Sequence, residues 1–124
     1  MPKFTHSDVL DSALSYLQSN GNSMTLCSAY PTTYLEATST YMLAQVSLAT
    51  TDYTIAAGDT SGRKVTVAQK DNVSVTNTGT VSHLAIVDTV NSKVLLVTEV
   101  ATQSLTAGNL VNIPTFKEEI QDPV

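Results

Sequence analysis

Residues 80–114, TVSHLAIVDTVNSKVLLVTEVATQSLTAGNLVNIP, decide the fold of this chain. They contain the two most apolar runs in the sequence, residues 84–87 and residues 94–97. Both runs are short and bounded by turn-forming residues, which is typical of strands rather than helices. The pattern predicts a strand, a turn and a second strand, followed by a turn at residues 107–109 and another strand. We expect this hairpin to be buried, with the other segments placed to cover it.

The composition fits a single all-β domain. The 124 residues are enough for one domain with a sizeable core. Charged residues make up only 14% of the chain, against the usual ~25%, and Thr, Ser and Asn fill the polar positions instead. The branched side chain of Thr suits a pleated, half-exposed surface, so a helical bundle is disfavoured. A surface with few charges is also easy to desolvate against a neighbouring protein.

The charge balance limits the classes of partner. The net charge is −5 and the pI is near 4.6. This speaks against nucleic acid, whose phosphates need a basic surface, and against an anionic membrane surface. No apolar run approaches the ~18 residues of a membrane span, and the first residues lack a signal-peptide pattern. The single cysteine, Cys27, cannot form an intrachain disulfide. We therefore expect a soluble protein made in a cytoplasm, with neither nucleic acid nor membrane as a partner.

One amphipathic helix is predicted near the N-terminus, from about residue 7 to residue 19, after an arm formed by residues 1–4. Ser7 is the expected cap, and Asp8 lies in the first turn, where the helix dipole favours negative charge. Asn20 and Gly21 predict a left-handed stop. An apolar stripe at helical spacing should lie on an open face or end of the β body. Its members are Val9, Leu10, Ala13, Leu14 and Leu17.

Short alternating segments fill the rest of the chain. Thr33 and Glu36 have capping-box spacing and could start a single helical turn. Lys70 and Asp71 predict a tight polar turn, and residues 57–62 are the clearest turn in the sequence. The other predicted strands are residues 23–29, 42–48, 52–56, 63–69, 72–76 and, at an edge of the sheet, 115–120.

This pattern predicts one domain, residues 1–124, that is mainly β. The expected architecture is an antiparallel β-sandwich or an open barrel with one N-terminal amphipathic helix. Residues 117–124 are expected to form a polar C-terminal tail, and the charges of Lys117, Glu118 and Glu119 to discourage pairing with another sheet edge.

Residues that could carry chemistry have plainer interpretations. The segment GDTSGRK, residues 58–64, lacks the Gly-Lys-Ser/Thr ending of a phosphate loop and the helix after it, so a hairpin turn is predicted. Asp52 and Asp59 lack the ligand spacing of a calcium loop and should form turns. His6 and His83 are far apart in sequence and do not make a zinc-ligand pair.

Buried packing is the predicted role of the remaining candidates. His83 alternates with Val81 and Ala85 in an apolar strand and should be packed and hydrogen-bonded. Cys27 lies in a strand pattern and should be packed rather than act as a nucleophile. The sequence therefore indicates no catalytic, cofactor-binding or metal-binding residue, no cofactor, and a protein that is not an enzyme.

Several segments together resemble small proteins of tailed bacteriophages that accompany the virion structural genes. The likeness covers nearly the whole chain and is one of overall pattern, with no functional residue to carry over. The segments are FTHSDVL (4–10), TLCSA (25–29), PTTY (31–34), EAT (36–38), DYTIA (52–56), GDTSGRKVTV (58–67), SHLAIVD (82–88), LTAGN (105–109) and VNIP (111–114).

This resemblance implies a non-enzymatic virion structural protein, made in the host bacterial cytoplasm and located in the virion. The first expectation is a capsid decoration or cement protein on the outside of the major capsid lattice. Its partners would be the major capsid protein or other virion structural proteins, and a homo-oligomer is plausible. The N-terminal arm, the polar tail and the Thr-rich turns are the expected contacts.

Two alternatives stay open at this stage. The first is a neck or tail component of the particle. The second is a host-surface module that binds glycans, for which the only support is the cluster of Tyr30, Tyr34 and Tyr41.

Overall fold

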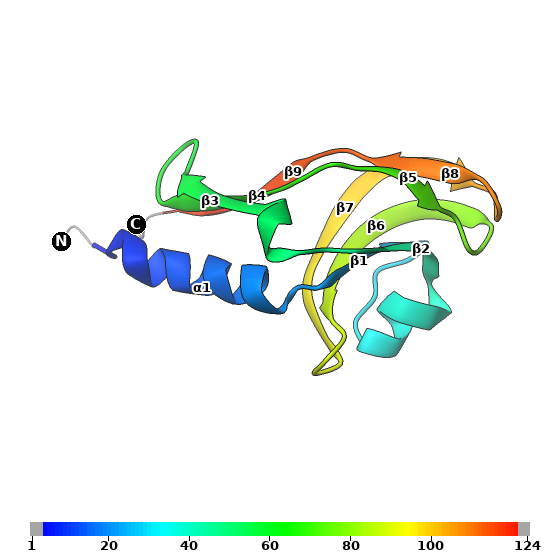
Figure 1. Ribbon diagram of the computed structural model, residues 1–124, viewed down its shortest axis with the longest axis horizontal. Helices are drawn as coiled ribbons and strands as arrows, with labels where there is room; N and C mark the ends of the chain where they lie inside the picture. Colours follow the sequence, from blue (N-terminus) through cyan, green and yellow to red (C-terminus); the bar gives the residue numbers. More distant parts are fainter. Residues whose placement is uncertain (1–3, 122–124) are drawn as a thin grey trace.

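The computed structural model describes residues 4–121 and is built mainly of antiparallel strands (Figure 1). The predicted fold class, mainly β with one N-terminal helix, is confirmed. In chain order the elements are α1 (Ser7–Asn20), β1 (Ser23–Cys27), the π-helical turn η1 (Glu36–Thr40), β2 (Met42–Ser47), the 3-10 turn η2 (Thr50–Asp52), β3 (Tyr53–Ala57), β4 (Arg63–Val67), β5 (Lys70–Ser74), β6 (Gly79–Asp88), β7 (Lys93–Leu105), β8 (Leu110–Ile113) and β9 (Phe116–Ile120).

The strands form an open sandwich of two layers. One layer is a four-stranded sheet in the order β2-β1-β6-β7. The other layer contains a three-stranded sheet, β3-β4-β9, and a two-stranded sheet, β5-β8. Because β4 runs on into β5 and β8 runs on into β9, these two smaller sheets follow one another along the molecule (Figure 1). A bridge between Ala44 and Val75 ties the layers together at one end.

The main core lies between the two layers and under α1. Leu14 and Leu17 of the helix pack there with Met24 of β1 and with Val65 and Val67 of β4. A second, smaller apolar cluster lies on the outer face of the four-stranded sheet. The segment that contains η1 covers this face, so all five residues of β1 are buried although they alternate between two faces. Burial on both faces makes β1 and its neighbour β6 the centre of the fold.

The start of α1 differs from the prediction by one residue. The cap is His6, whose backbone is extended (φ −62°, ψ 145°) and whose Nδ1 accepts a hydrogen bond of 3.1 Å from the Asp8 amide. Ser7, the predicted cap, is already the first helical residue. A histidine imidazole can accept a helix-end amide as a Ser hydroxyl does, which a preference for Ser as the cap does not anticipate.

The conformation at the C-terminal end of α1 also differs from the prediction. Gly21 has a φ of −77°, so the predicted left-handed stop is wrong. Its amide donates to the Leu17 carbonyl at 2.8 Å. A glycine is needed for space, since a Cβ at Gly21 would lie 2.5 Å from Tyr53 Oη and 2.7 Å from Ile86 Cγ2.

The apolar stripe of α1 is narrower than predicted. Leu10, Leu14 and Leu17 are buried, whereas Val9 and Ala13 are exposed. The helix therefore touches the sandwich along one line of side chains and leaves an apolar flank uncovered.

The predicted tight turn at Lys70 and Asp71 is wrong, because both residues belong to β5. β4 and β5 do not pair with each other, so the chain crosses from one sheet to the next without reversing. The irregular point comes at Asn72, which has a φ of 57° where the β5–β8 register shifts. Asn tolerates this left-handed conformation better than most residues.

The polar tail begins later than predicted. Residues 117–120 lie in β9 and pair with β4 as an edge strand, as the alternation at residues 115–120 predicted. Residues 1–3 and 122–124 lie outside the described residues. Of the predicted arm only Phe4 is described, and its side chain is 83% exposed.

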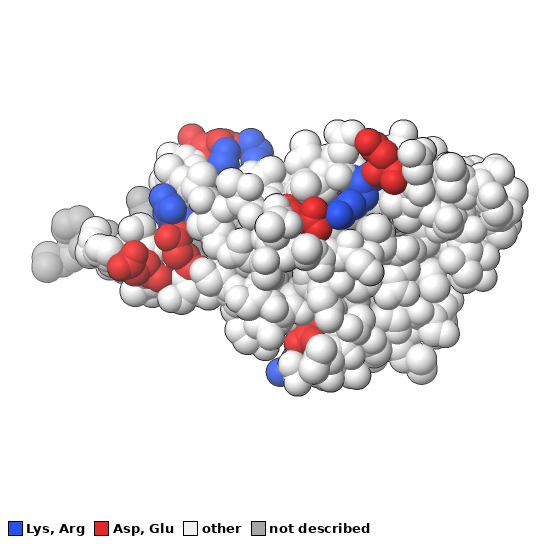
Figure 2. Space-filling view, in the orientation of Figure 1, with Lys and Arg blue, Asp and Glu red and all other residues white. Residues whose placement is uncertain are grey.

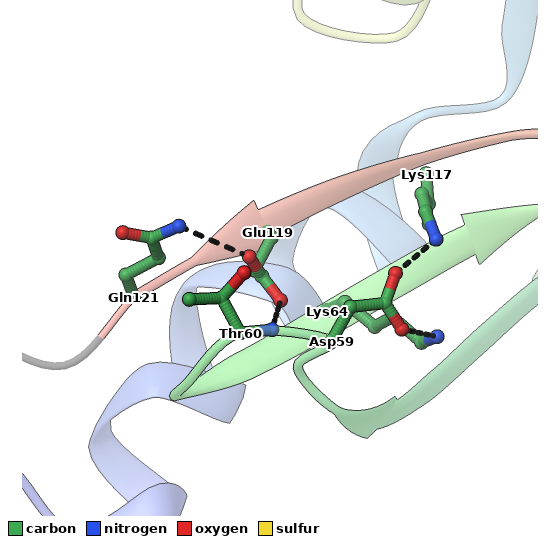
Figure 3. Close-up of polar contacts among 6 residues, drawn as sticks. All are labelled: Asp59, Thr60, Lys64, Lys117, Glu119 and Gln121. Carbon is green, nitrogen blue, oxygen red and sulfur yellow. Dashed lines mark hydrogen bonds and ion pairs between the residues drawn. The ribbon is translucent and has the colours of Figure 1, made fainter.

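Polar contacts fasten the β3–β4 turn to β9 (Figure 3). Asp59 in the turn forms ion pairs with Lys64 of β4 and with Lys117 of β9. The Thr60 amide donates to Glu119 Oε1 at 3.1 Å, and Gln121 Nε2 donates to the other oxygen of this carboxylate at 3.2 Å. These contacts order a segment that sequence reasoning assigned to a free tail.

We predict that replacing Asp59 with Asn lowers the free energy of unfolding at pH 6 and changes it little near pH 2. Hydrogen bonds from Lys117 and Lys64 lower the pKa of Asp59 from 3.8 to about 2. A carboxylate whose pKa is lowered on folding stabilises the protein above its ordinary pKa, and this contribution is lost as the pH falls from about 4 to about 2. Urea denaturation of both proteins across this range measures the difference. The matched control is Asp71→Asn, because Asp71 bonds only to the neutral Gln69 side chain.

Candidate functional site

β7 is a long strand at an edge of the four-stranded sheet. It has 13 residues and pairs with β6 along one side, and no other strand of residues 4–121 pairs with it. An edge strand offers unpaired amides and carbonyls along its free side. Leu95 is an extra residue in the pairing with β6, since Val94 and Leu96 face the consecutive residues Val87 and Ile86. Such a bulge bends and twists the edge.

The structure corrects the expectation of a fully buried hairpin. Residues 84–87 of β6 are completely buried, as predicted, but residues 94–97 of β7 are only half-buried. The reason is sheet order: β6 lies between β1 and β7, whereas β7 has a neighbour on one side only. One of the two most apolar runs in the chain, residues 94–97, is therefore partly exposed to solvent.

An apolar surface extends from β7 onto its neighbours. We call it the β7 surface and define it by seven residues: Ala13, Tyr16, Val94, Leu95, Leu96, Val97 and Ile120. A groove of about 380 Å³ between α1, β7 and β9 is lined by most of them, with Glu118 as its charged residue. On the opposite face of β7 a second hollow of about 330 Å³ is bounded by Tyr30, Pro31 and Thr32.

A third hollow lies further along β7. It has a volume of about 250 Å³ and is lined by Val100 and Ala101 of β7, by Val111 of β8, and by Pro114 and Phe116. Each of these three hollows is thus lined in part by β7. The strand combines a free edge with incomplete cover on both faces, so it is a candidate contact surface in the described part of the chain.

Three charged side chains without an ion pair lie beside the same strand, and the charge of one of them, Lys93, acts on its cross-strand neighbour Asp88. Within residues 4–121 every Lys and Arg except Lys93, the first residue of β7, takes part in an ion pair. Glu99 of β7 and Glu118 of β9 are the acidic residues in this part of the chain whose side chains have neither a hydrogen bond nor an ion pair. The β7 surface is therefore bordered by one cation and two anions that form no ion pair within the described chain.

Sequence reasoning missed this surface because it treated both apolar runs alike. The signal that distinguishes them is composition: the run at residues 94–97 is soon followed by the polar stretch at 102–104, which is exposed. In addition, Lys93 and Glu99 flank the run at equal distances from Leu96 along the sequence.

His83 and Cys27 are packed as predicted. His83 is half-buried, its Nδ1 lies 2.8 Å from the Ser82 hydroxyl, and its ring meets Tyr30 edge-on with centroids 5.4 Å apart. Cys27 is 0% exposed, and burial raises the pKa of its thiol above the ordinary value. A thiol with a raised pKa carries little reactive thiolate at neutral pH.

The carboxylates singled out in the sequence hold turns. Asp52 Oδ2 accepts from the Ala49 amide at 2.7 Å and from Lys70 Nζ at 2.9 Å, and the first of these bonds is the main reason for its lowered pKa. Asp88 is buried and accepts hydrogen bonds from the Asn91 side chain and from the amides of Asn91 and Val90, and these bonds, together with the charge of Lys93, lower its pKa. It therefore shapes the β6–β7 turn.

The remaining candidates are separated in the fold. Residues 58–62 form the turn between β3 and β4, with a φ of 69° at Gly62, so the predicted hairpin turn is confirmed. His6 caps α1, whereas His83 lies in β6, so the two histidines belong to different elements. Within residues 4–121 no three His, Cys, Asp or Glu side chains are grouped so that they could hold a metal ion.

The tyrosine cluster is divided in the same way. Tyr34 and Tyr41 are half-buried and pack on the small outer core, while Tyr30 is exposed. The apolar contacts of Tyr34 and Tyr41 account for the positions of these two side chains, and the glycan-binding alternative stays a prediction.

Among the described residues, no helix has both the length and the apolar content needed to cross a membrane. Comparisons with protein-family models, with curated proteins and with solved structures found no match for this chain.

Proposed function

We propose that this chain is a non-enzymatic structural protein of a bacteriophage virion, in the first place a capsid decoration or cement protein. The observation that carries the proposal is the weakly charged end of the molecule formed by β8 and η1, where Leu110 is 61% exposed (Figure 2). The β7 surface is a second place at which another protein chain can complete the molecule, because it is apolar and lies beside a free sheet edge. The whole-chain resemblance to small virion-associated phage proteins suggests the kind of assembly.

The distribution of charge supports an outer position on the particle. Figure 2 shows that Lys, Arg, Asp and Glu lie in small mixed groups on the visible face, and that the end formed by β8 and η1 shows almost none of them. Surfaces with few charges lose little hydration energy when a neighbour covers them. With a net charge of −5 the protein would be repelled by packaged DNA, which favours the outside of the shell.

We place the contact with the capsid at this weakly charged end. It carries the β5–β6 and β7–β8 turns, rich in Thr and Asn, and Leu110 at the start of β8 is 61% exposed there. The partner is the major capsid protein or an adjacent virion protein. A protein that bridges neighbouring capsid subunits adds buried area at the joints and so opposes the pressure of the DNA.

We predict that the purified protein will sediment with capsids assembled without it and will saturate at a fixed number of copies per shell. Leu110→Glu should abolish this binding, because it places a charge in the contact. The matched control is Val9→Glu: Val9 is 62% exposed, close to the value for Leu110, but lies on α1 at the other end of the molecule (Figure 1).

The outcomes separate the alternatives. Absence of binding at saturating protein concentration would refute the decoration role. Binding to complete tailed particles but not to tailless shells would instead indicate a neck or tail component.

A further inference from the structure

We infer that the hollow beside residues 98–103 of β7 binds a small uncharged molecule with an apolar body, such as an aromatic ring. We call it the interlayer hollow, because β1, β6 and β7 of one layer line it together with β8 and β9 of the other. The inference does not rest on the virion function, since it concerns the interior of the sandwich. The volume is about 250 Å³. A cavity of about 150 Å³ with aliphatic walls is enough to bind benzene, so a molecule of this kind has room here.

The walls of the interlayer hollow are largely apolar. Leu26 of β1, Leu84 of β6 and Ile113 of β8 line it and are buried members of the main core. Val100 of β7 and Phe116 of β9, both half-buried, add to these walls. Within residues 4–121 no buried side-chain oxygen or nitrogen lacks a hydrogen-bond partner, so none of them calls for a polar occupant. Walls of this kind favour an apolar molecule over water, which would find few hydrogen-bond partners.

The pairing of β6 with β7 is irregular beside the hollow. Its register places three residues of β7, 100–102, opposite the single residue Ser82 of β6. The edge strand is therefore lengthened at this point, and Val100 and Ala101 of the lengthened part line the hollow. Bulges bend a strand and are frequent beside active sites, where they redirect side chains. The hollow thus coincides with a specific irregularity of the strand.

The charged residues around the hollow are directed elsewhere. Lys117 of β9 borders it, but the ammonium group forms an ion pair with Asp59. Glu99 of β7 also borders it, but its cross-strand partner is His83, which pairs with Cys27 of the small outer core. Because cross-strand partners point to the same face of a sheet, the Glu99 carboxylate lies on the outer face. An ionised ligand would therefore lose hydration in the hollow without gaining an ion pair.

An uncharged polar group can be bound where the hollow opens to solvent. Gln103 and Asn112 line the hollow and are exposed, which places them at this opening. The amide of Gln103 can donate a hydrogen bond to a hydroxyl or carbonyl oxygen and can accept one from a hydroxyl. A ligand with an apolar body and one neutral hydrogen-bonding group therefore fits the hollow best.

Titration with benzyl alcohol, followed by NMR, tests the site. Benzyl alcohol has an aromatic ring and a neutral hydroxyl, whereas benzylamine has nearly the same shape and is positively charged at neutral pH. We expect benzyl alcohol to shift the methyl signals of Leu26, Leu84 and Ile113 saturably, with a dissociation constant of about 1 mM. Benzylamine should bind about tenfold more weakly or less, because its charge must be desolvated. Equal or tighter binding of benzylamine would overturn the assignment to uncharged ligands.

Two phenylalanine variants locate the binding. Ala101→Phe places a ring in the hollow and should weaken binding of benzyl alcohol about tenfold or more. The matched control is Thr102→Phe, at the next residue of β7, which does not line the hollow, and it should leave the dissociation constant unchanged. Both positions are exposed, and circular dichroism spectra matching the unmodified protein would establish that the variants are folded.

Two results would overturn the proposal. The site would be refuted if the unmodified protein showed no saturable shift up to about 10 mM benzyl alcohol, ten times the expected dissociation constant. Its location would be refuted if Ala101→Phe bound as well as the unmodified protein, or if the shifts were centred on Val94 and Leu95 of the β7 surface.

Discussion

Replacing Gly21 with Ala should lower the free energy of unfolding by about 3 kcal/mol, because a methyl group has no space at this position. The added Cβ would lie 2.5 Å from Tyr53 Oη, 2.7 Å from Ile86 Cγ2 and 2.8 Å from the Leu17 carbonyl oxygen. Tyr53 and Ile86 are buried, and the Leu17 carbonyl belongs to the helix backbone, so none of the three can move away cheaply.

A hydrogen bond adds to this effect. Tyr53 Oη donates to the Gly21 carbonyl at 2.7 Å in the buried interior. Displacing the tyrosine ring would leave its hydroxyl without this partner, and an unsatisfied buried polar group costs about 1–3 kcal/mol. The loss is therefore expected to be larger than for an ordinary Gly-to-Ala change.

Gly108→Ala is the matched control. Gly108 has a φ of 92°, but no neighbouring atom lies within 4 Å of the point that an added Cβ would occupy, so it tests backbone strain without a clash. We expect a cost of about 1 kcal/mol from the unfavourable backbone conformation. Urea denaturation of the two variants gives both values, and equal losses would show that the close approach of α1, β3 and β6 at Gly21 is wrong.

Gly21 also shows which features of the fold can be predicted from sequence. Local pattern placed the end of the helix correctly, because a glycine after a polar residue is a frequent stop. The physical reason was different, since the glycine is required by side chains from β3 and β6 that are distant in the chain. The spacing of apolar residues along the sequence indicates only the local secondary structure. The close approach of β3 and β6 to Gly21 depends on how the whole chain folds.

The candidate site could be predicted even less well. Residues 84–87 and 94–97 have the same apolar character, and sequence reasoning buried both. Their fates differ because β1 pairs with the free side of β6, a contact between residues about 60 positions apart along the chain. Strand order is set by such distant pairings, so no local pattern shows which of two apolar strands ends at the edge.

The difference in burial between β6 and β7 can be measured with the cross-strand neighbours Ile86 and Leu96. Ile86→Ala should lower the free energy of unfolding by about 4 kcal/mol, because the side chain is 0% exposed and its loss leaves a cavity in the main core. Leu96→Ala should cost the monomer about 1–2 kcal/mol, because this half-buried side chain already meets solvent and the site can refill with water. Thermal or urea unfolding at low protein concentration, where the monomer prevails, compares the two losses directly.

The size of the difference between the two losses tests how far β7 is exposed in the single chain. Equal losses for the two variants at low concentration would mean that β7 is as buried as β6 in the monomer, and would remove the basis for a contact surface on this strand.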